Sequence, residues 1–325
     1  MRAAYYEKNG SARDVLRVAE VETPQPGPGE VRIKLKTSGV NPSDVKAREG
    51  RTRKLSYPRV IPHSDGAGEI DMIGDGVPAA RKGERVWVWN GQWKRPSGTS
   101  AEYIVLPSAL APPLPAGASY EAGACLGIPA TTAYHAVAVA NVGKGSTVLI
   151  TGGAGGVGHY AIQFAKARGA TVLTTVSSEA KAALARQAGA DHTIDYKREN
   201  VGERVMALTG TTGVDAVVEM DLAANAKFYS NWLRPRGHVV VYGTGSAETA
   251  IPAQLLLVNA MKLAFVYVYE LTAQEREAVV SAINRMLESK TLINNVALSL
   301  PLDDIVAAHE AVEGGKIMGN VVVTL

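Results

Sequence analysis

The feature that most constrains the fold of this chain is a regular alternation of apolar runs and helical patterns between residues 146 and 243. The run "STVLIT" is apolar and rich in β-branched residues, as a strand buried on both faces is, and "GVGHYAIQFAKARGA" follows it with helical spacing. The pairing repeats through "TVLTTV", "EAKAALARQAGA", "HTIDY", "VGERVMALTG", "VDAVVEM", "AANAKFYSNWL" and "GHVVVYG". Strands that alternate with helices in this way predict parallel βαβ units, and therefore an α/β fold with a doubly wound parallel sheet.

The chain on either side of this series has a different pattern. Up to about residue 115, short segments such as "VRIKLKTSGV" and "ERVWVW" alternate apolar and polar residues between turns rich in Gly and Pro, which predicts a small, irregular, mostly-β unit. After the series, "LAFVYVY" predicts one more strand, and "TAQEREAVVSAINRMLESK" predicts an amphipathic helix that begins with a capping box of Thr272 and Glu275. The last segment, "GNVVVTL", again predicts a strand. Because 325 residues exceed one ordinary core, two domains are expected.

Composition excludes several classes of function. The net charge is +3 and the basic residues are dispersed, so no nucleic-acid surface is indicated. Cys125 is the single cysteine, which leaves no disulfide framework. The most membrane-like run, residues 251–269, contains Pro252, Gln254 and Lys262, so it predicts a helix followed by a buried strand rather than a membrane span. The chain also starts without an apolar signal core, and a cytoplasmic protein is expected.

The most specific local motif is "VLITGGAGGVG", in which Gly153, Gly155 and Gly158 fit the pattern G-x-G-x-x-G. The motif follows a predicted buried strand and opens a helix within a βαβ series, which is the context that makes it informative. One glycine permits a tight turn, one lets the backbone approach a pyrophosphate, and one lets helix and strand pack closely. The phosphates then lie at the positive end of the helix. We therefore predict a dinucleotide site, the alternative being a tight turn without a ligand.

The residues after the next strand favour NADP(H) over NAD(H). An NAD site usually has a carboxylate about 20 residues past the glycine loop, whereas this chain has Ser177 and Ser178, with Lys181 one helical turn later. Two hydroxyls and an ammonium group suit a 2′-phosphate, and Tyr196 could cover the adenosine side. The alternative is that a serine caps the helix and Lys181 is solvated. Glu179 would count against NADP(H) if it turned inward.

These residues resemble the medium-chain dehydrogenase/reductase superfamily, and within it the zeta-crystallin-like quinone oxidoreductases. The blocks that carry the resemblance occur in order: "SGVNPSDVKAREG", "HSDGAGEIDMIGDGV", "KGERVWV", "GIPATTAYHAV", "GGAGGVGHYAIQFAKARGA", "VVEMDLAAN" and "AHEAVEGGKIMGNVVVTL". The resemblance implies a GroES-like catalytic domain of residues 1–122 and 270–325. It also implies a Rossmann domain of residues 123–269 that binds NADPH, and a homodimer or homotetramer in which "LAFVYVY" could pair as an edge strand.

The resemblance also assigns cofactor contacts residue by residue. The matching positions are Asn41, Thr132, Ala154, Gly155, Gly156, Val157, Gly158, Ser177, Lys181, Tyr196, Asn225, Tyr242, Gly243, Thr244, Gly245, Val266, Tyr267, Val268, Tyr269 and Asn320. Some of them have a purely structural alternative, in which Thr132 starts a helix, Asn225 caps one, and Tyr242 and Tyr267 are core aromatics.

The segment "PHSDGAGEI" raises the question of a metal. Zinc-dependent members of the superfamily have a cysteine where this chain has Asn41, and a His-Glu pair where it has Ser64 and Asp65. His63 is displaced from the ligand position by one residue, which turns a side chain in an extended segment to the opposite face. A catalytic zinc ion needs three protein ligands. We therefore predict no metal, and expect His63 to be a turn or cleft residue.

Absence of zinc favours substrates that accept hydride easily. Reduction of a simple ketone leaves a basic alkoxide, which needs a Lewis acid or a positioned proton donor, whereas a quinone or enone spreads the charge over a conjugated oxygen. The expected activity is zinc-independent reduction of a quinone by NADPH. An alkenal or enone double-bond reductase and a non-catalytic NADPH-binding protein remain as alternatives. Asn41, Asp65 and Tyr57 are the candidate catalytic residues, and Lys46 and Arg48 could also line the substrate side.

Overall fold

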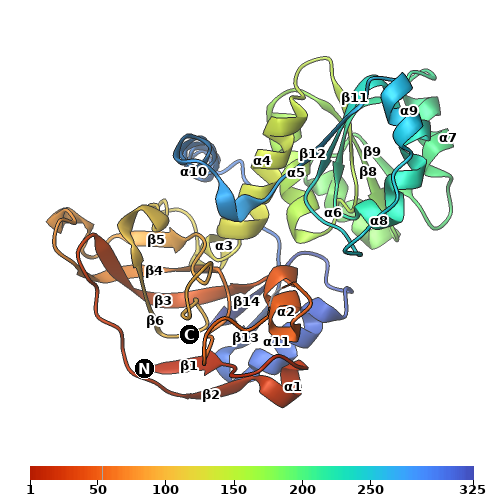
Figure 1. Cartoon of the computed structure of the whole chain (residues 1–325). Coiled ribbons are helices and arrows are strands. Elements are labelled where there is room, and N and C mark those ends of the chain that lie inside the picture. The colour runs from red at the N-terminus through yellow and green to blue at the C-terminus, as the bar shows by residue number, and fades with distance from the viewer. Residues whose placement is uncertain (53) are drawn as a thin grey trace. The chain divides into compact units, whose positions relative to one another are not determined.

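The computed structural model describes residues 1–52 and 54–325. The chain divides into two compact units, Met1–Pro129 with Val280–Leu325 (the first unit) and Ala130–Val279 (the second unit). In Figure 1 the first unit has red and orange strands as well as blue ones, because it combines the beginning and the end of the chain. In the part of the chain that the structure describes, no helix is long and apolar enough to cross a membrane.

The first unit is built on a mixed sheet of six strands. Its strand order is β13-β14-β3-β4-β5, and β6 pairs with the first half of β3. The C-terminal strand β14 pairs antiparallel with the second half of β3, with Val321 opposite Val40. The six strands are β3 (Glu30–Val40), β4 (Asp65–Ile73), β5 (Arg85–Val88), β6 (Tyr103–Pro107), β13 (Val296–Pro301) and β14 (Asn320–Thr324). A separate sheet of two antiparallel strands consists of β1 (Arg2–Tyr5) and β2 (Arg17–Glu20). The helices are α1 (Ala12–Val15), α2 (Pro42–Glu49), α3 (Tyr120–Gly123) and α11 (Ile305–Glu313).

The second unit is a doubly wound parallel sheet, as the alternation of strands and helices predicts. Its order is β12-β11-β10-β7-β8-β9, so the direction of winding reverses between β7 and β10. Ligands bind outside the carboxyl ends of the strands at such a switch point. The strands are β7 (Thr147–Ile150), β8 (Thr171–Val176), β9 (His192–Asp195), β10 (Val214–Glu219), β11 (Leu233–Val241) and β12 (Lys262–Phe265). The helices are α4 (Thr131–Ala140), α5 (Gly156–Ala167), α6 (Glu179–Gln187), α7 (Val201–Leu208), α8 (Leu222–Asn225) and α9 (Ala253–Val258), and α10 (Ala273–Glu288) runs across the boundary between the units.

Two local expectations differ from the structure. The segment "AANAKFYSNWL" forms only the single turn α8 and a 3₁₀ stretch, Ala226–Asn231, rather than one helix. The segment "LAFVYVY" was expected as a buried strand and, in an oligomer, as an edge strand; β12 is last in the strand order of its unit and leaves Phe265 67% exposed, so it is not buried. A hydrophobic run is therefore compatible with a sheet edge as well as with a buried strand. The expected capping box is present, since the Glu275 carboxylate accepts from the Thr272 N–H at 2.8 Å and the Thr272 hydroxyl accepts from the Glu275 N–H.

Candidate active site

The glycine turn, residues 152–158, connects β7 to α5. Its left-handed residue is Gly152, with φ 71°, which the G-x-G-x-x-G match does not include. A Cβ at Gly153 would lie 2.2 Å from Thr174 Oγ1, and a Cβ at Gly158 would lie 2.3 Å from the Gly152 carbonyl oxygen. These two glycines therefore allow the turn to pack against β8 and allow the helix to pack against the turn.

Gly155 faces a different environment from its neighbours. Among the described residues, a Cβ at Gly155 would meet only the Gly152 carbonyl oxygen, at 3.3 Å. Gly155 is the N-cap of α5, so the backbone N–H groups of the first helical turn, at Gly156, Val157 and Gly158, lie at the positive end of the helix. This open, glycine-lined helix start suits the phosphates of a dinucleotide, whereas Ala154, which is buried, fills the inside of the turn.

The carboxyl end of β8 brings together the residues that the sequence suggests for the 2′-phosphate. Ser177 is half-buried, and Ser178 caps α6 by accepting a hydrogen bond from the Lys181 N–H at 3.3 Å. The Tyr196 N–H donates to the Val176 carbonyl oxygen at 3.1 Å, which places Tyr196 beside this edge with its side chain 53% exposed.

The possible counter-signal, Glu179, does not turn inward. Glu179 is exposed on α6, and its carboxylate forms an ion pair with Arg186. The carboxylate nearest to the end of β8 along the chain is therefore paired on the outside of the helix. The half-buried Lys181 lies two residues later on the same helix.

Glu219, which the sequence did not single out, accepts hydrogen bonds from several segments at the switch point. It ends β10, is fully buried, and its Oε1 accepts from Thr151 Oγ1 at 2.9 Å, from the Asp221 N–H at 2.7 Å and from Asn225 Nδ2 at 3.0 Å. Its Oε2 accepts from the Tyr229 hydroxyl at 3.2 Å. Burial raises the pKa of Glu219, and these hydrogen bonds oppose the rise. The signal in the sequence was a carboxylate, Glu219, directly after the apolar run Ala216–Val218.

The remaining predicted residues of the second unit lie after β11 and β12 or on α4. The Tyr242 N–H donates to the Glu219 carbonyl oxygen at 3.0 Å, and a Cβ at Gly243 would lie 2.2 Å from the Met220 carbonyl oxygen. After β12, Tyr267 is 55% exposed between two buried valines. Val266 and Val268 are these buried valines, and the ring of Tyr269 lies 5.2 Å from the ring of Tyr267. Thr244 is exposed, and the Gly245 N–H donates to Asp221 Oδ1. Thr132 is buried near the start of α4.

In the first unit, the structure pairs Asn41 with Asp65. Asn41 is the N-cap of α2, ahead of Pro42, and its backbone N–H donates to Asp44 Oδ2 at 2.8 Å. Its side-chain Nδ2 donates to Asp65 Oδ2 at 2.8 Å. Asp65 begins β4 and is fully buried; burial raises its pKa well above the usual value, against the effect of the Asn41 amide. The pair thus fixes the orientation of the Asn41 side chain.

Tyr57 and Arg48 occupy different places from the Asn41–Asp65 pair. Tyr57 lines a pocket of about 260 Å³ in the first unit, together with Trp93, and its hydroxyl donates to the Lys94 carbonyl oxygen at 2.8 Å. Arg48 is fully buried, and its Nη2 forms an ion pair with Glu313, so it does not line a substrate surface as expected. Lys46 is half-buried on α2, and Asn320 begins β14 with its N–H donating to the Asn295 carbonyl oxygen.

His63 is neither an exposed turn residue nor a cleft residue, contrary to expectation. It is fully buried, with φ 76°, and burial lowers its pKa to about 3. Within residues 1–52 and 54–325, no group of three or more His, Cys, Asp and Glu side chains could hold a metal ion. The three residues aligned with zinc ligands fit zinc poorly, because the Asn41 amide is a hydrogen-bond donor to Asp65 and Ser64 offers a hydroxyl.

Comparisons with known proteins match both units. The family model of the alcohol dehydrogenase GroES-like domain matches residues 27–116, and that of zinc-binding dehydrogenase matches residues 156–285. The quinone oxidoreductase of Rattus norvegicus is 32% identical over 330 residues, which cover 100% of this chain and 98% of the rat protein. This chain belongs to the medium-chain dehydrogenase/reductase superfamily, in its quinone oxidoreductase type.

Two further relatives of this medium-chain dehydrogenase/reductase bear on cofactor and substrate. A mycobacterial protein solved in complex with NADPH superimposes with a TM-score of 0.89 at 30% identity, with both chains covered completely. A 2-haloacrylate reductase from a Burkholderia species is 29% identical over 99% of this chain and 98% of its own length. The match to the zinc-binding dehydrogenase model starts at residue 156, so Asn41, Ser64 and Asp65 lie outside it.

Proposed function

We propose that this chain is a zinc-independent NADPH:quinone oxidoreductase. The observation that carries the cofactor assignment is the open helix start at Gly155, which lies at the switch point of the parallel sheet. The Ser177 hydroxyl after β8 and Lys181 on α6 favour the 2′-phosphate of NADPH over the free ribose hydroxyl of NADH, whereas Ser178 caps the helix. The mycobacterial relative solved with NADPH supports the same choice.

The residues present fit NADPH at several positions. The glycine turn would hold the pyrophosphate, Ser177, Lys181 and Tyr196 would hold the adenosine end, and Thr132 and Asn41 would lie toward the nicotinamide. When bound, NADPH supplies the hydride for the reaction. The remaining proposed contacts are Ala154, Gly156, Val157, Gly158, Asn225, Tyr242, Gly243, Thr244, Val266, Tyr267, Val268 and Asn320.

The proposed acceptor is a quinone because the residues aligned with zinc ligands fit zinc poorly. The Asn41 amide is held by the buried Asp65, and we propose that Asn41 orients the acceptor while Asp65 positions Asn41. A quinone needs little more than this, because its conjugated oxygens spread the negative charge and water supplies the proton. The 32% identical rat quinone oxidoreductase supports this assignment.

Two alternatives remain, and one has a specific observation in its favour. The Burkholderia relative is a 2-haloacrylate reductase, so reduction of a conjugated carbon–carbon double bond is the second candidate activity. A non-catalytic NADPH-binding protein is the third candidate. We propose that Tyr57, which lines a pocket with Trp93, faces the acceptor.

We also propose a homodimer or homotetramer that works in the cytoplasm. The edge strand β12 exposes Phe265, and a second copy could extend the sheet by pairing along this edge. The single cysteine, Cys125, is buried and unpaired, which suits a reducing compartment.

The activity is tested by NADPH oxidation, followed by absorbance, with a panel of acceptors. We expect turnover with 1,4-benzoquinone and 9,10-phenanthrenequinone that exceeds turnover with 2-alkenals and 2-haloacrylates. Preference for the alkenes would replace the quinone assignment with the second candidate. Tight NADPH binding without reduction of any acceptor would identify the third.

A further inference from the structure

A chain of buried polar side chains crosses the first unit from α11 to the start of β4. Its centre is a pair of histidines, His63 just before β4 and His309 on α11, both with 0% exposure. Their Nε2 atoms lie 2.9 Å apart, and their rings are stacked with centroids 5.1 Å apart and an interplanar angle of 25°. His63 has φ 76°, a backbone conformation that non-glycine residues adopt only when the surroundings hold them.

From His63 the chain continues to the main chain of Asp65. His63 Nδ1 lies 2.8 Å from Ser38 Oγ, and Ser38 Oγ lies 2.8 Å from Thr99 Oγ1. Thr99 Oγ1 donates to the Asp65 carbonyl oxygen. A carbonyl oxygen can only accept, so the single hydroxyl hydrogen of Thr99 is used there. Ser38 must then donate to Thr99, and His63 Nδ1 must carry the hydrogen that it donates to Ser38.

This direction of donation fixes the protonation of both imidazoles. With its hydrogen on Nδ1, an uncharged His63 has a bare Nε2, which can only accept. His309 must therefore carry its hydrogen on Nε2 and have a bare Nδ1. Within residues 1–52 and 54–325, no hydrogen-bond partner is found for His309 Nδ1 or for Nε and Nη1 of the buried Arg48.

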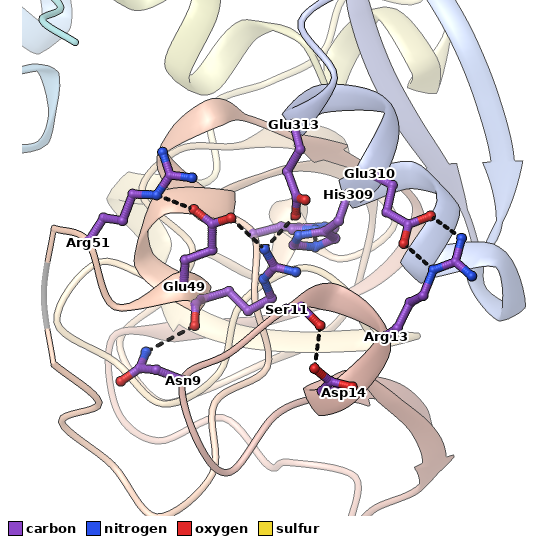
Figure 2. A network of polar contacts seen from close by, with 11 residues as sticks. Asn9, Ser11, Arg13, Asp14, Glu49, Arg51, His309, Glu310 and Glu313 are labelled. Atoms are coloured by element: carbon purple, nitrogen blue, oxygen red, sulfur yellow. Dashed lines mark hydrogen bonds and ion pairs between the residues drawn. The ribbon is translucent and has the colours of Figure 1, made fainter.

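Burial opposes the entry of a proton into the pair. It lowers the pKa of His309, and the interactions of His309 with His63 and with the Arg48 guanidinium lower that pKa further. Figure 2 draws His309 together with the ion pairs of this region, Arg51 with Glu49 and Arg13 with Glu310. Among the described residues, Arg48 pairs with Glu49 and Glu313. The charged groups around these and at the two ends of this series of side chains are Arg51 just after α2, Glu310 on α11 with its partner Arg13 on α1, and Asp65 on β4.

We propose that His309 is a positioning residue, which acts through His63, Ser38 and Thr99 to hold the main chain at Asp65 and thereby the Asn41–Asp65 pair. This inference rests on the proposed function, because Asn41 is the group proposed to orient the acceptor. While both histidines are neutral, every hydrogen bond of this series is donated in the same direction, from His309 toward the Asp65 carbonyl oxygen. A proton that enters His63 forces His309 to move its hydrogen from Nε2 to Nδ1, for which no partner is found within residues 1–52 and 54–325.

The proposal predicts an unusual tautomer that can be observed directly. In protein labelled with ¹⁵N-histidine, we expect His63 at neutral pH to be the Nδ1–H tautomer and His309 the Nε2–H tautomer, both uncharged. Assignments come from the loss of one ring spin system in His63→Gln and in His309→Gln. A protonated ring at neutral pH, or an Nε2–H tautomer for His63, would overturn the proposal.

The positioning role is tested with two substitutions of His309 and one control. Glutamine keeps an N–H donor for His63 and cannot take up a proton, whereas phenylalanine keeps the bulk and offers no donor. We expect His309→Phe to lower kcat for quinone reduction at least tenfold with little change in KM for NADPH, and His309→Gln to restore kcat to within threefold. Glu310→Gln, which breaks only the surface ion pair with Arg13, should stay within twofold. Equal kcat in His309→Phe and wild type would refute the role.

The pH dependence of unfolding gives a readout that is independent of catalysis. The folded-state pKa values of both histidines are depressed, so between about pH 6.5 and the folded values the unfolded chain binds more protons, and stability falls as pH falls. Each such histidine contributes about a tenfold change in the unfolding equilibrium constant per pH unit. Between pH 4.5 and 5.5, His309→Gln should therefore lower the slope of the logarithm of this constant against pH by about one. An unchanged slope would contradict buried, neutral imidazoles.

Failure of the proposed function and failure of this inference can be told apart. If the wild type reduced no quinone, the proposed function would fail, while the histidine tautomers and the pH slope of unfolding would still test the histidine pair.

Discussion

Substitution of alanine for two glycines in the same turn should separate cofactor binding from packing. At Gly158 the added Cβ would lie 2.3 Å from the Gly152 carbonyl oxygen and 3.0 Å from Gly153 Cα, both of which belong to the backbone. The helix and the turn must then move apart, and overpacking of this kind costs about 1–3 kcal/mol. At Gly155 the added Cβ would lie 3.3 Å from the Gly152 carbonyl oxygen, and φ −78° is allowed for alanine.

We therefore expect opposite signatures in two assays. Gly158→Ala should lower the free energy of unfolding of the protein without cofactor by about 1–3 kcal/mol, measured by urea denaturation. Gly155→Ala should change it by at most about 1 kcal/mol but raise the Kd for NADPH at least tenfold, about 1.4 kcal/mol, measured by calorimetric titration. Wild-type affinity in a folded Gly155→Ala variant would refute the claim that the phosphates lie at this helix start.

Three other substitutions test the rest of the site. Lys181→Ala should weaken the affinity for NADPH at least tenfold more than the affinity for NADH, measured by calorimetric titration. The control Lys227→Ala, at an exposed position of the same unit, should change neither affinity. Equal losses of affinity for the two cofactors would exclude a 2′-phosphate role for Lys181. Glu219→Leu deprives four hydrogen-bond donors of their acceptor and should lower the free energy of unfolding by about 3 kcal/mol or more, since each buried unsatisfied group costs about 1–3 kcal/mol. An unchanged urea midpoint would contradict this. Asn41→Ala should lower kcat for the quinone about tenfold while the NADPH affinity stays within threefold, and a wild-type kcat would remove Asn41 from the mechanism.

The sequence predicts the second unit well because its periodicity is local. A strand buried on both faces is a continuous apolar run, and each such run between 146 and 243 became a strand of the parallel sheet. The glycine motif is equally local, although the residue with positive φ, Gly152, is one position before the match. The sequence offered a serine cap for the next helix without a choice between Ser177 and Ser178, and the cap is Ser178.

Contacts between segments far apart in the chain were beyond the reach of the sequence. The partner of His63 is His309, 246 residues later, and only the pairing of β14 with β3 brings the C-terminal segment to that sheet. The same holds for Arg48, which was expected to line the substrate side but is buried against Glu313. Glu219 was overlooked because a carboxylate at the end of a strand gives no sign of how many donors converge on it.

The most direct test of a zinc-independent NADPH:quinone oxidoreductase is the rate of NADPH oxidation with 9,10-phenanthrenequinone in protein treated with a strong chelator and checked by elemental analysis. The account predicts an undiminished rate in protein with far less than one zinc ion per chain, and a much lower rate with NADH at the same concentration. A rate that disappears with the metal and returns on addition of zinc would contradict it, as would the absence of quinone reduction by untreated protein.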